Sequence, residues 1–329
     1  MDSDNPGSSV SDSRKNVRSP SLYGQSQMRR LSQHLTFVLL CLTSTALLWK
    51  PFVASLYLAL HDDEFTHILL ILPVSATLIL SEWGSLKFKP SPSPRIGVSL
   101  LLAGILIAVF SSASRARLSP DSRLAAGMFA LVTLWIAAFV LCFGTKVARS
   151  LLFPLCFLFW IVPIPAFALG RIVQWLQSGS AFAAWLLFSA AGVPTARDGI
   201  LLSIPGLNIE VAQECSSIRS SLMLLVTAMV LAHVLLRTPW RKAAVVLLVV
   251  PLSVAKNGLR IFTISMLGTH VDRGFLTGRL HRDGGILFFL IALGAILLAI
   301  WFLRTGEDAA ANPAGLSSVA AEPLAPSLN

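Results

Sequence analysis

The sequence predicts an all-α fold, a polytopic bundle of transmembrane helices with about eight spans. Of its 329 residues, 55% are hydrophobic and only 13% are charged, whereas soluble domains average about 45–50% and about 25%. A helix needs about 20 predominantly apolar residues to cross a bilayer, and the chain holds several such runs in series. A soluble core does not explain this excess, so we expect an integral membrane protein.

The apolar runs form one membrane domain, residues 35–303, with a polar tail at each end. Residues 1–34 are polar and basic and predict a disordered cytoplasmic tail, and residues 304–329, rich in Ala, Pro and Ser, predict a second one. The predicted spans are 35–60, 65–83, 96–113, 124–143, 151–169, 218–236, 243–267 and 284–303.

The net charge of +10 comes largely from short basic loops between the apolar runs, at 87–95, 146–149 and 237–242. The loop at 61–64 is acidic instead. This is the positive-inside pattern of a multi-pass protein of the cytoplasmic membrane. The cytoplasmic loops of a membrane protein therefore explain the positive charge. The expected partner is the lipid bilayer, and no nucleic acid is expected.

Residues 170–193 are the weakest point of the span count, since they are less apolar and include Trp175 and Trp185. A crossing there would invert the later topology and place the basic loop at 237–242 outside. We therefore expect an interfacial or re-entrant helix. The polar stretch that follows contains Ile200 to Val211, which predicts short strands around a Pro205-Gly206 turn on the outer face.

Three polar residues fall at this same predicted outer face. Cys215 immediately precedes the span 218–236, and a helix N-terminus favours a thiolate. Arg260 lies about 26 Å of helix rise beyond Ala243, near the outer interface. His281 precedes the last span, which enters from outside.

Together these residues could perform acyl transfer. A thiolate attacks a carbonyl, an imidazole handles the proton, and a guanidinium stabilises the oxyanion. Singly, each has a plainer interpretation, because interfacial cysteines are usually inert, arginines snorkel to headgroups and loop histidines are solvated. Arg219, four residues after Cys215, could share the anion-binding role or pair with Glu214 or a lipid phosphate.

At these positions the chain resembles the exosortase/archaeosortase family of membrane-embedded cysteine transpeptidases or proteases. The family's Cys-Ser-Gly-Ile-Arg-Ser core appears as Cys215-Ser216-Ser217-Ile218-Arg219-Ser220, and its Asn-x-x-Arg motif as Asn257 to Arg260. His281 is followed shortly by Gly285, as in the family. Ser217 replaces the usual Gly, and the loop before His67 departs from the common Ser-His-Gly-Phe pattern.

The resemblance implies an enzyme, a cysteine peptidase or transpeptidase, with catalytic Cys215, Arg260 and His281. Substrate binding is assigned to Arg219, Glu214, Asn257 and His67, and no metal or cofactor is expected. The partners would be membrane-anchored proteins with a C-terminal sorting signal of the PEP-CTERM type, linked to exopolysaccharide production. Cleavage would take place at the membrane face toward the periplasm or cell exterior.

Two other functions stay open at this point. A transporter or lipid-linked polysaccharide permease would use the arginines and His281 to bind an anionic substrate. A non-catalytic exopolysaccharide assembly factor would tolerate loss of Cys215.

Overall fold

The computed structural model describes residues 20–86, 91–114, 116–211, 218–272, 274 and 285–311, with backbone alone at 20–26, 29–30 and 308–311. Six helical segments are long and apolar enough to cross a membrane in this part of the chain, and eight if each of two bent helix pairs counts as one span. Helices dominate, and the described strands form one small sheet. These findings confirm the predicted all-α transmembrane bundle.

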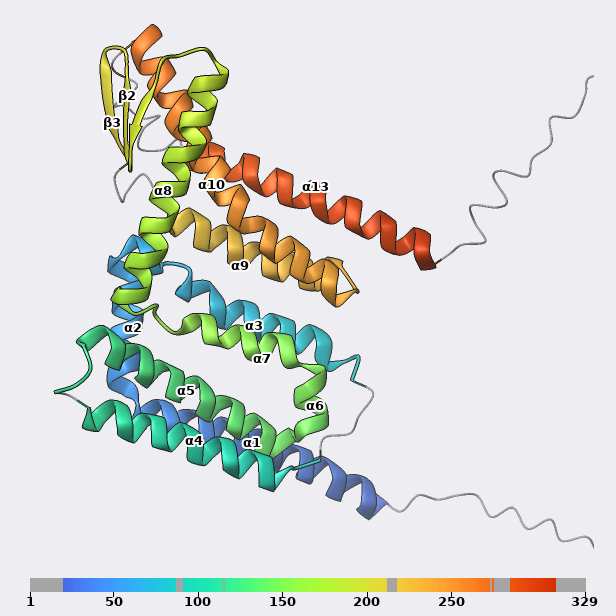
Figure 1. Cartoon of the computed structure of the whole chain (residues 1–329). Helices are drawn as coiled ribbons and strands as arrows, with labels where there is room; N and C mark the ends of the chain where they lie inside the picture. The colour runs from blue at the N-terminus through green and yellow to red at the C-terminus, as the bar shows by residue number, and fades with distance from the viewer. Residues whose placement is uncertain are drawn as a thin grey trace, which may run out of the picture.

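The N-terminal half of the chain forms a first group of helices around α5 (Figure 1). Most of α5 is buried, unlike the other spanning helices. The elements are α1 (Pro20–Leu47), α2 (Trp49–His61), the 3-10 turn η1 (Asp63–Phe65), α3 (Ile68–Trp83), α4 (Pro94–Ala113), α5 (Pro120–Phe143), α6 (Thr145–Ser150), α7 (Leu152–Phe157) and the 3-10 turn η2 (Leu158–Ile161).

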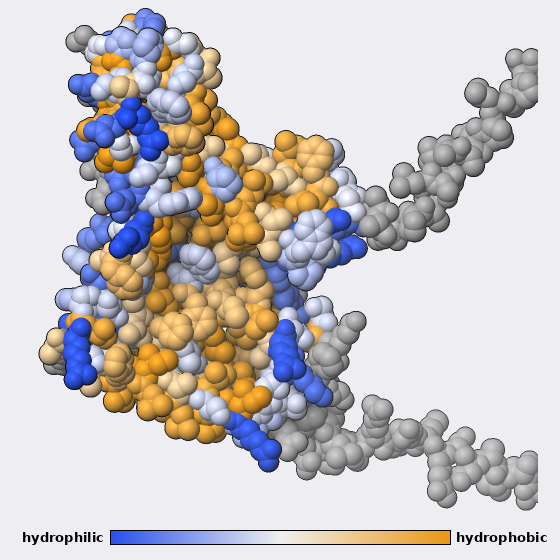
Figure 2. All heavy atoms as spheres, viewed as in Figure 1, coloured by the Kyte–Doolittle hydropathy of each residue, from blue (hydrophilic) through white to orange (hydrophobic). Residues whose placement is uncertain are grey.

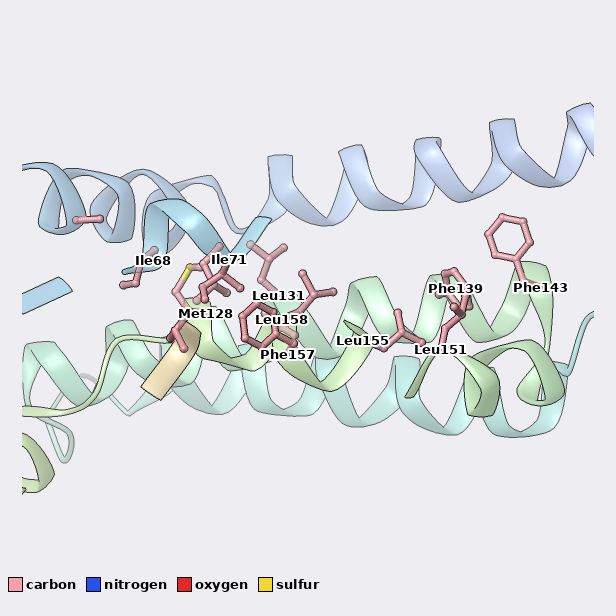
Figure 3. Close-up of a cluster of buried hydrophobic side chains, with 14 of the residues drawn as sticks. Ile68, Ile71, Met128, Leu131, Phe139, Phe143, Leu151, Leu155, Phe157 and Leu158 are labelled. Carbon is pink, nitrogen blue, oxygen red and sulfur yellow. The ribbon is translucent and has the colours of Figure 1, made fainter. Parts of the chain in front are cut away.

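Apolar side chains of α3, α5, α7 and η2 interlock to form the core of this half (Figure 3). Met128 and Leu131 of α5 lie against Ile68 and Ile71 of α3, and all four are fully buried or nearly so. Val226 from the C-terminal half also belongs to this cluster. The core therefore joins the two halves of the molecule.

The C-terminal half consists of α8 (Ala166–Ala190), a three-stranded sheet, α9 (Ile218–Leu235), α10 (Pro239–His270) and α13 (Gly285–Ala311). The helices α9, α10 and α13 share a second apolar cluster. In Figure 1, α10 runs beside α9 in its first part and beside α8 toward the sheet in its second part.

Two of the predicted spans are interrupted. The span 35–60 is broken at Leu48, where α1 and α2 meet at 81°. Pro51 explains the break, because proline cannot donate a hydrogen bond to the carbonyl of Leu47 and its ring clashes with that carbonyl. The span 151–169 ends at Ile161, and α8 begins at Ala166 after a bend of 96°.

The second break also has prolines at its centre, Pro163 and Pro165. Beyond them α8 runs across the ends of the spanning helices (Figure 1). This arrangement agrees with an interfacial or re-entrant helix at 170–193, although the helix begins earlier, at Ala166.

The predicted strands are confirmed as an antiparallel sheet of order β1 (Ala196–Asp198), β2 (Leu201–Ile204) and β3 (Leu207–Glu210). The turn between β2 and β3 is Pro205-Gly206, and Gly206 has a φ of 82°, which suits the third position of a type II turn. Leu202 and Ile204 bury one face of β2 against α8.

Connections gather at the two ends of the bundle, although Arg117 in the α4–α5 connection and Arg123 in the first turn of α5 make a basic segment at the same end as the acidic η1. Figure 1 shows η1, the α4–α5 connection and the sheet at one end, and α6, the α9–α10 connection and both described chain ends at the other. Hydrophilic residues collect at these two ends, and hydrophobic residues cover much of the surface between them (Figure 2).

Small residues let α8 and α10 approach closely, with both helices running in the same direction. Gly179 faces Val254, and a Cβ atom on Gly258 would lie 2.5 Å from the Cβ of Ala183. Farther along, the rings of Phe188 and Phe262 pack edge to face with centroids 5.1 Å apart. Close packing of this kind is typical of membrane helices with small residues at the interface.

Candidate functional site

The acidic turn η1 contacts the first turn of α9 through an ion pair. Arg219 Nη1 lies 2.6 Å from Asp63 Oδ1. The two side chains are 53% and 79% exposed, so the pair contributes at most about 1 kcal/mol to stability. The pair marks the place where the 61–67 loop contacts the beginning of α9. Within the described residues, Arg219 thus pairs with Asp63. Glu214, the partner that the sequence suggested for Arg219, lies outside the described residues.

His67 lies beneath this loop, at the entry to α3. Its side chain is 2% exposed, and Nδ1 is 3.2 Å from the carbonyl oxygen of Glu64. The ring therefore packs inside the protein and supports the loop that carries Asp63. A direct contact between His67 and a substrate stays a prediction.

Lys256 is a residue of this region that the sequence analysis did not select. Its ammonium donates a hydrogen bond to the hydroxyl of Ser220 on α9, and its side chain is 6% exposed. No carboxylate in the described part of the chain forms an ion pair with it. The signal was a lysine inside the apolar run 243–267, where ionisable residues are costly and are usually functional.

The Asn-x-x-Arg motif lies on α10, immediately after Lys256. Asn257 is 1% exposed and Arg260 is partly buried. Residues three apart share one face of a helix. Nη1 of Arg260 is 3.9 Å from the position of a Cβ atom on Gly285, the first residue of α13. The guanidinium thus extends from α10 to the beginning of α13, four residues after His281.

Two anchors hold the chain on either side of the predicted nucleophile. The side chain of Gln177 on α8 donates a hydrogen bond of 2.9 Å to the carbonyl of Val211. Ile218 packs against Val173 and Leu176, also on α8. Thus α8 fixes both the end of the sheet and the beginning of α9.

Cys215 and Glu214, between these anchors, lie outside the described residues, and so does His281 before α13. The structure brings together the elements that precede or follow these residues in the chain. Here η1 contacts α9, α9 contacts α10, and α10 contacts α13. Asn257 and His67, two further residues of the predicted site, are both buried. The separations among Cys215, Arg260 and His281 stay predictions.

Three cations lie in the described surroundings, together with the acidic segment 62–64. Arg219, Lys256 and Arg260 come from two neighbouring helices, and Asp63 pairs with only the first of them. Positive surroundings favour a thiolate over a thiol and stabilise a developing oxyanion. Among the residues that the structure describes, no three His, Cys, Asp or Glu side chains form a group that could hold a metal ion.

No curated protein and no solved structure is similar to the chain at a significant level. The sequence profile of the transmembrane exosortases matches residues 59–298. This range runs from the end of α2 into α13 and includes the cysteine, arginine and histidine motifs. The chain therefore belongs to the transmembrane exosortase family.

Proposed function

We propose that this protein is a cysteine peptidase or transpeptidase that removes the C-terminal sorting signal of exported membrane-anchored proteins. The observation that carries the proposal is the family match across nearly the whole membrane domain, with the Cys, Asn-x-x-Arg and His motifs inside it. The cations of α9 and α10 support it, because Arg219 lies four residues after Cys215 and Arg260 extends to the beginning of α13, four residues after His281.

In the proposed reaction, the Sγ of Cys215 attacks the scissile carbonyl carbon while His281 takes the thiol proton. Arg260 stabilises the negative charge on the carbonyl oxygen of the tetrahedral intermediate. The intermediate collapses to a thioester, and the C–N bond breaks as His281 returns the proton to the departing amine. An amine or water then attacks the thioester and regenerates the thiol.

The other residues of the region would position substrate. Arg219 on α9 and Asn257 on α10 would contact the substrate directly, while His67 would act through the η1 loop that it supports. The proposed substrates carry a Pro-Glu-Pro motif, a transmembrane helix and a basic cluster. The site would face the periplasm or cell exterior from the cytoplasmic membrane.

The test compares C-terminal tails in membrane fractions from cells that carry the wild-type chain or the Cys215→Ala variant. Tails retained only with Cys215→Ala are the expected result. Cys156→Ala is a matched control, because Cys156 is an exposed cysteine of α7 away from the motifs. The same tails in all three strains, at equal abundance of the chain, would refute a catalytic thiol and favour a permease or an assembly factor.

A further inference from the structure

The strand β3 has one hydrogen-bonded side and one outward side. The N–H of Val211 donates to the carbonyl of Ile200 over 3.1 Å, so this opposite pair is hydrogen-bonded. Such pairs alternate along an antiparallel ladder. In the observed register, Leu202↔Ile209 and Ile204↔Leu207 are therefore bonded pairs. Asn208 and Glu210 consequently direct their N–H and C=O groups away from β2.

Within the described residues, no other strand pairs with this outward side. The strand order β1-β2-β3 makes β3 an edge strand, and both Asn208 and Glu210 are exposed. No hydrogen bond to their backbone groups occurs within the described chain. Exposed edges are often blocked by Pro or a bulge or guarded by charge and short length; β3 is only four residues long and ends in the charged Glu210, but neither Pro nor a bulge interrupts it between Leu207 and Glu210.

The edge is also held rigidly. Ile204 and Val211 are buried in one cluster with Phe188 of α8 and Ile261 of α10. The carbonyl of Val211 accepts the hydrogen bond from Gln177. A strand fixed in this way loses little conformational entropy when another strand pairs with it.

We propose that the outer edge of β3, Leu207–Glu210, binds an extended segment of the substrate polypeptide by β-strand addition. The inference rests on the proposed peptidase function and specifies how that enzyme holds its substrate. Glu210 lies five residues before Cys215, a separation of at most about 17 Å along an extended chain. A peptide paired with β3 therefore presents its neighbouring residues within reach of the proposed nucleophile.

Binding by β-strand addition suits a polypeptide substrate. Main-chain hydrogen bonds provide affinity for any extended polypeptide, and alternate side chains provide selectivity. The side chains of Asn208 and Glu210 lie on the exposed face of the sheet, opposite the face that packs on α8. They are the groups that alternate substrate side chains would meet.

Asn208→Pro tests the edge in the full-length chain. Proline removes the outward N–H of residue 208, which is outside the β2–β3 ladder, and proline is tolerated on strand edges. Asn208→Ala is the matched control, since it removes the side chain but keeps the N–H. The probe is a coexpressed membrane reporter whose tail carries Pro-Glu-Pro, a transmembrane helix and a basic cluster.

With Asn208→Pro, tail release should be at least about tenfold slower than wild type, because a peptide hydrogen bond is lost and the ring obstructs pairing. With Asn208→Ala, release should be slowed clearly less than with Asn208→Pro, because the N–H that pairs with the peptide is kept and only the side-chain contact is lost. Equal rates for the two variants would overturn the proposal. Failure of the wild-type chain to release the tail would instead refute the peptidase function.

Photo-crosslinking tests binding without cleavage. In the Cys215→Ser chain, a benzoylphenylalanine at position 208 should capture the reporter, whereas the same group at Arg197 on the opposite edge should not. The measurement does not depend on whether Asn208→Pro folds. Capture at 197 but not at 208, or at neither position, would overturn the assignment of the β3 edge.

Discussion

Gly258→Ala should slow substrate processing by separating α8 from α10. The added Cβ would lie 2.5 Å from the Cβ of Ala183 and 3.0 Å from the backbone nitrogen of Ala184. Carbon atoms in contact are normally about 3.5–4.0 Å apart, so the helices must separate by roughly 1 Å. The neighbouring atoms belong to a backbone and a Cβ, which no side-chain rotation can move.

The expected loss of stability is modest, because two effects oppose each other. Overpacking costs about 1–3 kcal/mol, while alanine is favoured over glycine in a helix by about 1 kcal/mol. The effect on activity should be larger. Gly258 lies between Asn257 and Arg260, and a misplacement of about 1 Å can reduce a rate by roughly a hundredfold.

The assay combines tail release from the membrane reporter with thermal unfolding of the purified chain in detergent, followed by tryptophan fluorescence. Gly294→Ala on α13 is the control, because a Cβ there meets nothing within 4 Å. Gly179→Ala should be intermediate, since its Cβ would lie 3.1 Å from a methyl group of Val254. Normal processing by Gly258→Ala, with Gly294→Ala unchanged, would show that the close helix crossing does not position the site.

Three further predictions use the same reporter or fusions to the chain. Arg260→Lys should reach the membrane normally but process at least about a hundredfold more slowly, because lysine cannot reproduce the guanidinium fork; Arg219→Lys should be milder, and the reverse order would make Arg219 the catalytic cation. Lys256→Met should match wild type in thermal stability, because the substitution removes a buried charge. It should nevertheless process substrate at least about tenfold more slowly than Lys256→Arg. Full activity of Lys256→Met would make Lys256 purely structural. Topology reporters fused after Asp62 or Asn208 should read extracytoplasmic. Reporters fused after Arg149, Pro239 or Glu307 should read cytoplasmic. A cytoplasmic signal at Asn208 would separate the site from its proposed compartment.

Much of the candidate site could be found from sequence because its motifs are short and local. The residues around Cys215, Arg260 and His281 each form a recognisable pattern within a few positions. Lys256 was missed although it adjoins one of these motifs. A lysine in an apolar run gives a weak sequence signal, and its contact with Ser220 on another helix becomes visible only in the structure.

The ion-pair partner of Arg219 and the burial of His67 also became visible only in the tertiary structure. From sequence, Arg219 had a local acidic candidate in Glu214 and a lipid alternative, but the structure pairs it with Asp63 from η1. His67 was selected as a binding residue, and the structure places it under the same loop at 2% exposure. Burial and pairing across the fold are set by which helices meet, which residue spacing does not encode.

By itself the sequence determined the membrane class, the approximate spans, the alternation of loops between two faces and the strand turn at Pro205-Gly206. These features follow from hydropathy, charge and backbone restrictions, which act over a few residues or sum along one segment. Tertiary structure alone decided the breaks of 81° and 96°, the close crossing at Gly258 and the contacts that connect η1, α9, α10 and α13. A proline permits a bend, but its angle is chosen by packing among helices that are distant in sequence.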